Sequence, residues 1–145
     1  MTTRYRMLTR ISLIVLLLLC LTVGGAWLVW RSPLGYDPPA DLPEVGAGPH
    51  QVFVYGTLRS PVVRWLVTTD YLESTPAVLE DYRRDGLDVD TAPGHQVEGE
   101  LLSVDRETLL ELDRYERLGV RYRRVPVKLQ DGQQVWLYQR LSDQD

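Results

Sequence analysis

The longest apolar run of the chain lies near its N-terminus. Residues 11–30 contain no charged side chain, and the ten residues before them carry three arginines and no acid. Twenty helical residues with a rise of about 1.5 Å each cover about 30 Å, the hydrocarbon thickness of a bilayer. Trp27 and Trp30 stand at the far end of the run, where interfacial aromatic residues belong. The pattern favours a single transmembrane anchor over residues 11–30, preceded by a basic tail over residues 1–10.

Two other interpretations of this run stay open. A cleaved signal peptide could use Gly24 and Ala26 at its cleavage site, although the run exceeds the ~7–15 apolar residues typical of such peptides. A buried helix of a soluble core also fits the hydropathy. For an anchor, the positive-inside rule gives the orientation, because acidic residues outnumber the single arginine over residues 31–44. We therefore expect a cytoplasmic N-terminus and an extracytoplasmic domain.

Alternating and periodic patterns in the remainder predict a domain of mixed strands and helices. Residues 31–49 are rich in proline and glycine and predict a semi-stiff linker, so the domain is expected over residues 50–145. Helices are expected over 61–69, with Val62, Trp65 and Leu66 inward, and over 105–116, capped by Asp105. Strands are expected over 50–55, 96–104, 122–129 and 133–140, with turns at Pro93-Gly94 and Asp131-Gly132. The fold class is α+β: a small mixed or antiparallel sheet, curled into a barrel-like domain, with two or more short helices.

Composition narrows the classes of partner. The 145 residues are 44% hydrophobic and 25% charged, which argues against disorder and against several membrane spans. The net charge is −4 and the basic residues are dispersed, so nucleic acid is not expected as a partner. Cys20 is the only cysteine and His50 and His95 are the only histidines, so we expect no disulfide, no metal site and no cofactor. The oligomeric state stays open.

The first candidate for a binding site is the segment that follows the first predicted strand. An apolar run, Val52–Val54, breaks at Gly56 and meets Ser60-Pro61, a typical helix start. A strand–loop–helix junction of this kind exposes backbone N–H groups beside a positive helix end, where an anionic group can bind. The same pattern also fits an ordinary tight turn.

The second candidate is a carboxylate on an apolar helix face. Leu109, Leu112 and Glu116 are spaced i, i+3, i+7, so they share one face of the predicted helix. Burial and the negative helix terminus would both raise the pKa of Glu116, which suits a general acid/base at neutral pH. A solvated Glu116 beyond the last turn is the alternative. Tyr122 either packs in the core or directs its hydroxyl at this site, while Arg123 and Arg124 are expected on the surface.

Five segments in this order resemble the gamma-glutamylcyclotransferase-like superfamily, closest to its gamma-glutamylamine cyclotransferase-like branch. The segments are V-F-V-Y-G-T-L-R, a P-G turn, V-E-G-E-L-L, L-D-R-Y-E and Y-R-R-V-P-V. The resemblance implies an enzyme that releases 5-oxoproline from a gamma-glutamyl amine or related derivative. It implies Glu116 as the general acid/base, and Tyr55, Gly56, Thr57 and Leu58 as the residues that bind the glutamyl part, with no metal.

Two features depart from the familiar members. Arg117 follows the carboxylate where many members have glycine, and its charge would either lower the pKa of Glu116 or select an acidic substrate. The apolar N-terminal run is also unusual, because familiar members are soluble. A non-catalytic domain of the same fold, which binds a small ligand or a partner, is therefore the alternative function.

Overall fold

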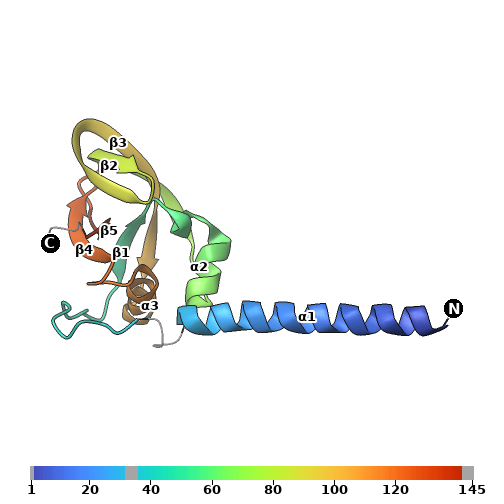
Figure 1. The fold of residues 1–145 in the computed structure, drawn as a ribbon. Helices are drawn as coiled ribbons and strands as arrows, with labels where there is room; N and C mark the ends of the chain where they lie inside the picture. The colour runs from blue at the N-terminus through green and yellow to red at the C-terminus, as the bar shows by residue number, and fades with distance from the viewer. Residues whose placement is uncertain (1, 32–35, 142–145) are drawn as a thin grey trace. The chain divides into compact units, whose positions relative to one another are not determined.

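The computed structural model describes residues 2–31 and 36–141, which fall into two compact units, Met1–Asp37 and Pro38–Asp145. The first unit is one helix, α1 (Thr2–Arg31), which includes the predicted basic tail as well as the apolar run (Figure 1). Its window Arg10–Trp27 has a mean hydropathy of 2.0 and 0% of it is buried. Such a helix is long and apolar enough to cross a membrane, and a signal sequence has the same properties.

The second unit is built on a five-stranded mixed sheet, which confirms the predicted α+β class (Figure 1). The sheet order is β2-β3-β1-β5-β4. The central strand β1 is antiparallel to β3 and parallel to β5. The strands are β1 (His50–Val54), β2 (Ser74–Asp85), β3 (Asp88–Val104), β4 (Tyr122–Lys128) and β5 (Gln134–Arg140).

The sheet does not close into a barrel, so this part of the prediction was wrong. Strands β2 and β4 form its two edges. Each contains a proline, Pro76 in β2 and Pro126 in β4, and a residue without an N–H cannot donate to a further ladder. One backbone hydrogen bond, from the Gln130 N–H to the Val78 carbonyl (3.4 Å), links the β2 edge to the segment after β4.

The Pro93-Gly94 pair does not reverse the chain, which corrects a second expectation. β3 continues through it, and the reversal occurs earlier, at Gly86, where φ is +60°. The register between β2 and β3 shifts between Glu80 and Tyr82, so the proline–glycine pair lies in an irregularity of the ladder. The long β2–β3 hairpin therefore extends well beyond the single strand, 96–104, that the sequence pattern predicted in this region.

Helix α2 (Pro61–Thr68) presents the face opposite to the one expected. Val62, Trp65 and Leu66 are 65%, 53% and 39% exposed, whereas Arg64 is only 3% exposed. The Arg64 guanidinium donates to the Leu58 and Arg59 carbonyls and to Glu100 Oε2, at 2.9–3.1 Å. The orientation of α2 is thus determined by acceptors for a buried cation, which the hydropathy pattern does not reveal.

Helix α3 (Arg106–Glu116) begins where the sequence predicted. The Asp105 carboxylate accepts a hydrogen bond from the Thr108 N–H at 2.8 Å, as an N-cap does. Leu109 and Leu112 are 1% and 0% exposed and pack with residues of β1 in one core cluster. Leu42 of the predicted linker packs against the same cluster, so the domain begins before residue 50.

Candidate active site

The loop after β1 forms one side of the candidate site. Thr57–Arg59 make a 3-10 turn (η2), in which the Arg59 and Ser60 N–H groups donate to the Gly56 and Thr57 carbonyls at 3.2 and 3.1 Å. The N–H groups of Thr57 and Leu58 open this turn, where a helix supplies no acceptor of its own. The Arg64 guanidinium, from α2, donates hydrogen bonds to the Leu58 and Arg59 carbonyls. The loop carbonyls are therefore fixed by hydrogen bonds, and the Thr57 and Leu58 N–H groups have no acceptor within the turn itself.

Glu116 forms the other side, as the last residue of α3. Its side chain is half-buried, and this burial raises its pKa from 4.5 to about 7, partly opposed by the positive charge of Arg121. Arg121 is the cation that lowers the pKa here, whereas the sequence had suggested Arg117. Arg117 instead ends the helix in the left-handed conformation, with φ +52°. The carboxyl group titrates in the neutral range, where it can both accept and donate a proton.

Contacts between neighbouring residues bring these two sides together. Thr57 Oγ1 and Tyr115 Oη lie 3.0 Å apart, so the loop is hydrogen-bonded to the residue beside Glu116. The pKa of Tyr55 is raised mainly by burial, then by Tyr122 and by the charge of Glu116. The pKa of Tyr122 is raised by burial and next by Glu116. Four predicted site positions, Tyr55, Thr57, Glu116 and Tyr122, therefore belong to one neighbourhood.

The remaining predicted positions are Gly56 and Leu58. Their nearest described neighbours are the core and the β2–β3 hairpin, not Glu116. Leu58 is 2% exposed and its side chain lies in the core. A Cβ placed on Gly56 would lie 3.9 Å from Leu87 Cδ2, so this glycine faces the tip of the β2–β3 hairpin.

The hairpin tip is a part of the site that sequence reasoning missed. Both tyrosine hydroxyls reach the Leu87 carbonyl: Tyr122 donates to it at 3.2 Å, and Tyr55 lies 3.3 Å from it while donating to the Tyr138 carbonyl at 2.9 Å. Arg84 Nη1 donates to the Tyr55 carbonyl at 2.7 Å. No local signal pointed to Leu87 and Arg84, because the reversal between β2 and β3 was placed at the wrong residue.

A buried ion pair holds the C-terminal end of α3 against the sheet. Asp113, 5% exposed, accepts hydrogen bonds from Tyr138 Oη and from Arg124 Nη1, both at 2.5 Å. Burial raises the pKa of Asp113, opposed by the Tyr138 hydrogen bond and by Arg124. The Arg124 guanidinium also lies over the ring of Trp136, 5.1 Å from its centroid. Arg124 is thus buried and paired, which corrects its expected place on the surface.

The chemistry available to this arrangement is proton transfer beside a set of hydrogen-bond donors. Within the described part of the chain, no group of three or more His, Cys, Asp or Glu side chains could hold a metal ion. A half-buried carboxyl group, two phenols and an N–H turn can bind a small polar molecule and move its protons.

The comparison that decides the family covers most of the second unit. Residues 52–145 match the family described as gamma-glutamyl cyclotransferase, AIG2-like. The chain belongs to this family. The match confirms the resemblance drawn from the sequence segments, and it includes both the loop and Glu116 of this cyclotransferase-family domain.

Solved structures agree with the family. An Arabidopsis thaliana protein solved in solution is 26% identical, with a TM-score of 0.56 over 70% of this chain and 69% of its own. An uncharacterized Homo sapiens protein is 20% identical, with a TM-score of 0.57 over 64% of this chain and 67% of its own. A gamma-glutamyl cyclotransferase is 19% identical, with a TM-score of 0.54 over 64% and 67%, so the last two show the fold alone. No curated protein matches the chain.

Proposed function

We propose that the chain is a membrane-anchored gamma-glutamyl cyclotransferase-type enzyme that releases 5-oxoproline from a gamma-glutamyl amine or related derivative. The observation that carries the proposal is Glu116, a half-buried carboxyl group with a pKa of about 7 that interacts electrostatically with Tyr55 at the start of the loop. Membership of the family supports the reaction class.

In the proposed reaction, the substrate's own α-amine attacks its γ-carbonyl. The new bond joins the α-nitrogen to the carbonyl carbon, and the bond from that carbon to the leaving nitrogen breaks. Because the nucleophile is part of the substrate, holding the glutamyl chain in a ring-like conformation supplies much of the acceleration. The Thr57 and Leu58 N–H groups suit the substrate's carboxylate, and the Arg64 contacts keep that turn in place.

Glu116 has two tasks in this scheme. As a carboxylate it accepts a proton from the α-ammonium group, so that the amine becomes nucleophilic. As a carboxylic acid it then returns that proton to the leaving nitrogen, and the free amine departs. The attacking nitrogen loses its second proton as the ring closes, and the regenerated carboxylate accepts it and passes it to the departing amine or to solvent. A pKa of about 7 leaves both forms accessible near neutral pH. Tyr55 and Tyr122 are proposed to orient the substrate beside the carboxyl group.

The membrane anchor is the second part of the proposal. None of the apolar window of α1 is buried, as expected for a segment whose surroundings are lipid, and Arg4 and Arg6 precede it. We infer that α1 spans the bilayer with its N-terminus in the cytoplasm and the cyclotransferase domain outside.

The test is 5-oxoproline release by the full chain from a panel of gamma-glutamyl amines, with Glu116→Gln beside it. We expect wild-type turnover of at least one substrate, and a loss of about 10²–10⁴-fold in the Gln variant, the usual contribution of a positioned proton shuttle. Glu107→Gln, exposed at the other end of the same helix, is the matched control and should keep full activity. No product across the panel, or an unimpaired Glu116→Gln, would refute the enzyme.

The alternative, a non-catalytic binding domain, predicts a different result when the same two proteins are also tested for ligand-induced thermal stabilisation. Ligand would raise the melting temperature of both wild type and Glu116→Gln, and no 5-oxoproline would form with either.

A further inference from the structure

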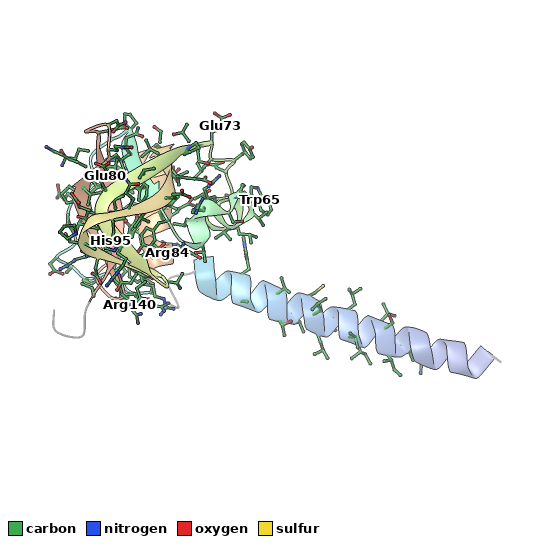
Figure 2. The ribbon with its side chains drawn as sticks, turned by 90° about the horizontal axis from the view of Figure 1, so that it is seen from above. Trp65, Glu73, Glu80, Arg84, His95 and Arg140 are labelled. Atoms are coloured by element: carbon green, nitrogen blue, oxygen red, sulfur yellow. The ribbon has the colours of Figure 1, made fainter. Side chains whose placement is uncertain are left out.

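The exposed face of α2 is the least expected surface of the domain. Val62, Trp65 and Leu66 occupy positions i, i+3 and i+4, so they form one apolar face. Trp65 lies on the outer side of α2 (Figure 2). Tyr71, shortly after the helix, is 81% exposed. A contiguous exposed group of large apolar side chains typically marks an interaction surface.

The inner face of α2 keeps this apolar face outward. Arg64 donates to Glu100 Oε2 at 2.9 Å and to Ser74 Oγ at 3.1 Å, in addition to the loop carbonyls. Thr68, 2% exposed, donates to the Arg64 carbonyl. Rotation of the helix to bury Trp65 would break the bonds from the Arg64 guanidinium to Glu100, Ser74 and the loop carbonyls, and would bring the buried Arg64 and Thr68 side chains out to solvent. The exposure is therefore a stable property of the fold.

The length of the tether limits what can cover this face. Only residues 32–37 separate the end of α1 at Arg31 from the domain, which begins at Pro38. Even fully extended, that segment reaches no more than about 25 Å. Within the domain, Pro39 and Leu42 lie against Gly119. The first residues of the domain thus lie next to Gly119, directly after α3, and α2 packs on the same helix.

We propose that α2 docks the cyclotransferase domain on the surface of the bilayer that α1 spans, with Val62, Trp65 and Leu66 in the interfacial region. The proposal rests on the anchor proposed above, and it adds a second membrane contact made by the folded domain. Tryptophan favours the boundary between headgroups and acyl chains, and an amphipathic helix lies along that boundary with its apolar face inward.

The charges beside this face indicate which lipid it fits. Along the chain, one arginine, Arg59, precedes α2 and two acids, Asp70 and Glu73, follow it, so the flanking segments supply no cluster of basic residues. Attraction to anionic lipids requires a cluster of basic residues, and salt screens that attraction. Docking by apolar burial should therefore proceed on zwitterionic phosphatidylcholine and should change little with salt. Because η2 leads directly into α2 through Ser60, docking also holds the candidate substrate loop near the membrane surface.

The test uses the full chain in phosphatidylcholine vesicles with one fluorescent probe. Cys20→Ser removes the only thiol, and Val62→Cys or His95→Cys then carries the probe. His95, exposed on β3, is the control position in the same domain (Figure 2). We expect nitroxide-labelled phosphatidylcholine to quench the probe at 62, at low and at high salt, and to leave the probe at 95 bright. Trp65→Ser with Leu66→Ser should remove the quenching at 62.

The unfavourable outcomes separate the two proposals. Chain that stays in the vesicle fraction after alkaline extraction, with no quenching at 62, would overturn docking and leave the anchor intact. Chain that leaves the vesicles would overturn the anchor and docking together. A disulfide between two copies of the unlabelled Val62→Cys variant, together with no quenching of the labelled one, would show that a second copy covers the face and would also overturn docking. None of these outcomes depends on 5-oxoproline release.

Discussion

Replacing Glu116 by glutamine should make the domain more stable at alkaline pH. Burial raises the pKa of Glu116 in the folded state from 4.5 to about 7. A rise of this size corresponds to about 3 kcal/mol of preference for the protonated form. The folded state therefore binds a proton more tightly than the unfolded state does, and the stability from this group is complete below about pH 4.5 and is lost as the pH rises through 7.

The glutamine side chain has a similar shape and cannot ionise. Its contribution to stability should stay constant over the range in which the wild type loses about 3 kcal/mol. Subtraction of the two unfolding free energies cancels every other titrating group that the substitution leaves undisturbed. The difference, variant minus wild type, should thus grow by about 3 kcal/mol as the pH rises from about 4 to about 8, and half of this change should be reached near pH 6, midway between the unfolded and folded pKa values.

Chemical denaturation of Pro38–Asp145, the compact unit that contains the whole sheet, measures this difference at a series of pH values. Glu107→Gln, exposed in the first turn of α3, serves as the control and should give a difference that hardly changes with pH. Parallel curves for wild type and Glu116→Gln would refute the reasoning, because they would mean that Glu116 ionises as readily in the folded domain as in the unfolded chain.

Three other substitutions have effects that follow from the geometry. Arg117→Gly should raise the free energy of unfolding by about 1 kcal/mol, since a left-handed φ of +52° strains every residue with a Cβ. Gly99→Ala should lower it by about 1–3 kcal/mol, because the new Cβ would meet Phe53 Cζ at 2.5 Å. Asp113→Asn should cost about 3 kcal/mol by leaving Arg124 buried and unpaired, and should reduce 5-oxoproline release by loosening the end of α3. Denaturation midpoints and the activity assay measure these changes.

Each of these has a control or a contrary outcome. Arg114→Gly, inside α3, should destabilise by about 1 kcal/mol, and a gain there would remove the conformational reason given for Arg117. Gly46→Ala, with nothing within 4 Å of its new Cβ, should be nearly neutral beside Gly99→Ala. Full stability of Asp113→Asn would show that Tyr138 and Arg124 find other partners.

Local signals were sufficient for several elements. The β1 pattern, the Asp105 cap and the Asp131-Gly132 hairpin all depend on neighbours within a few residues, and they appear where expected. The spacing of Leu109, Leu112 and Glu116 placed the carboxylate on the buried face of α3. These predictions succeed because capping, turn geometry and helix periodicity are properties of short segments.

Long-range partners decided the rest. Arg64 and Arg124 resemble surface cations in sequence, yet both are buried, because Glu100 and Asp113 reach them from other elements. The hydrogen bonds of the buried Arg64 also leave the apolar face of α2 exposed to solvent. Pro93-Gly94 resembles a chain reversal, but β3 continues through it, and the pair lies where the register between β2 and β3 shifts.

The sequence by itself determined the α+β class, the family and the two segments of the candidate site. Only the tertiary structure decided three other features. These are the hydrogen bonds from Tyr55 and Tyr122 to the Leu87 carbonyl, the open sheet, and the exposed apolar face of α2. The physical reason is that a buried charge or an unpaired carbonyl must find a partner in space, and the chain supplies that partner from a distant segment.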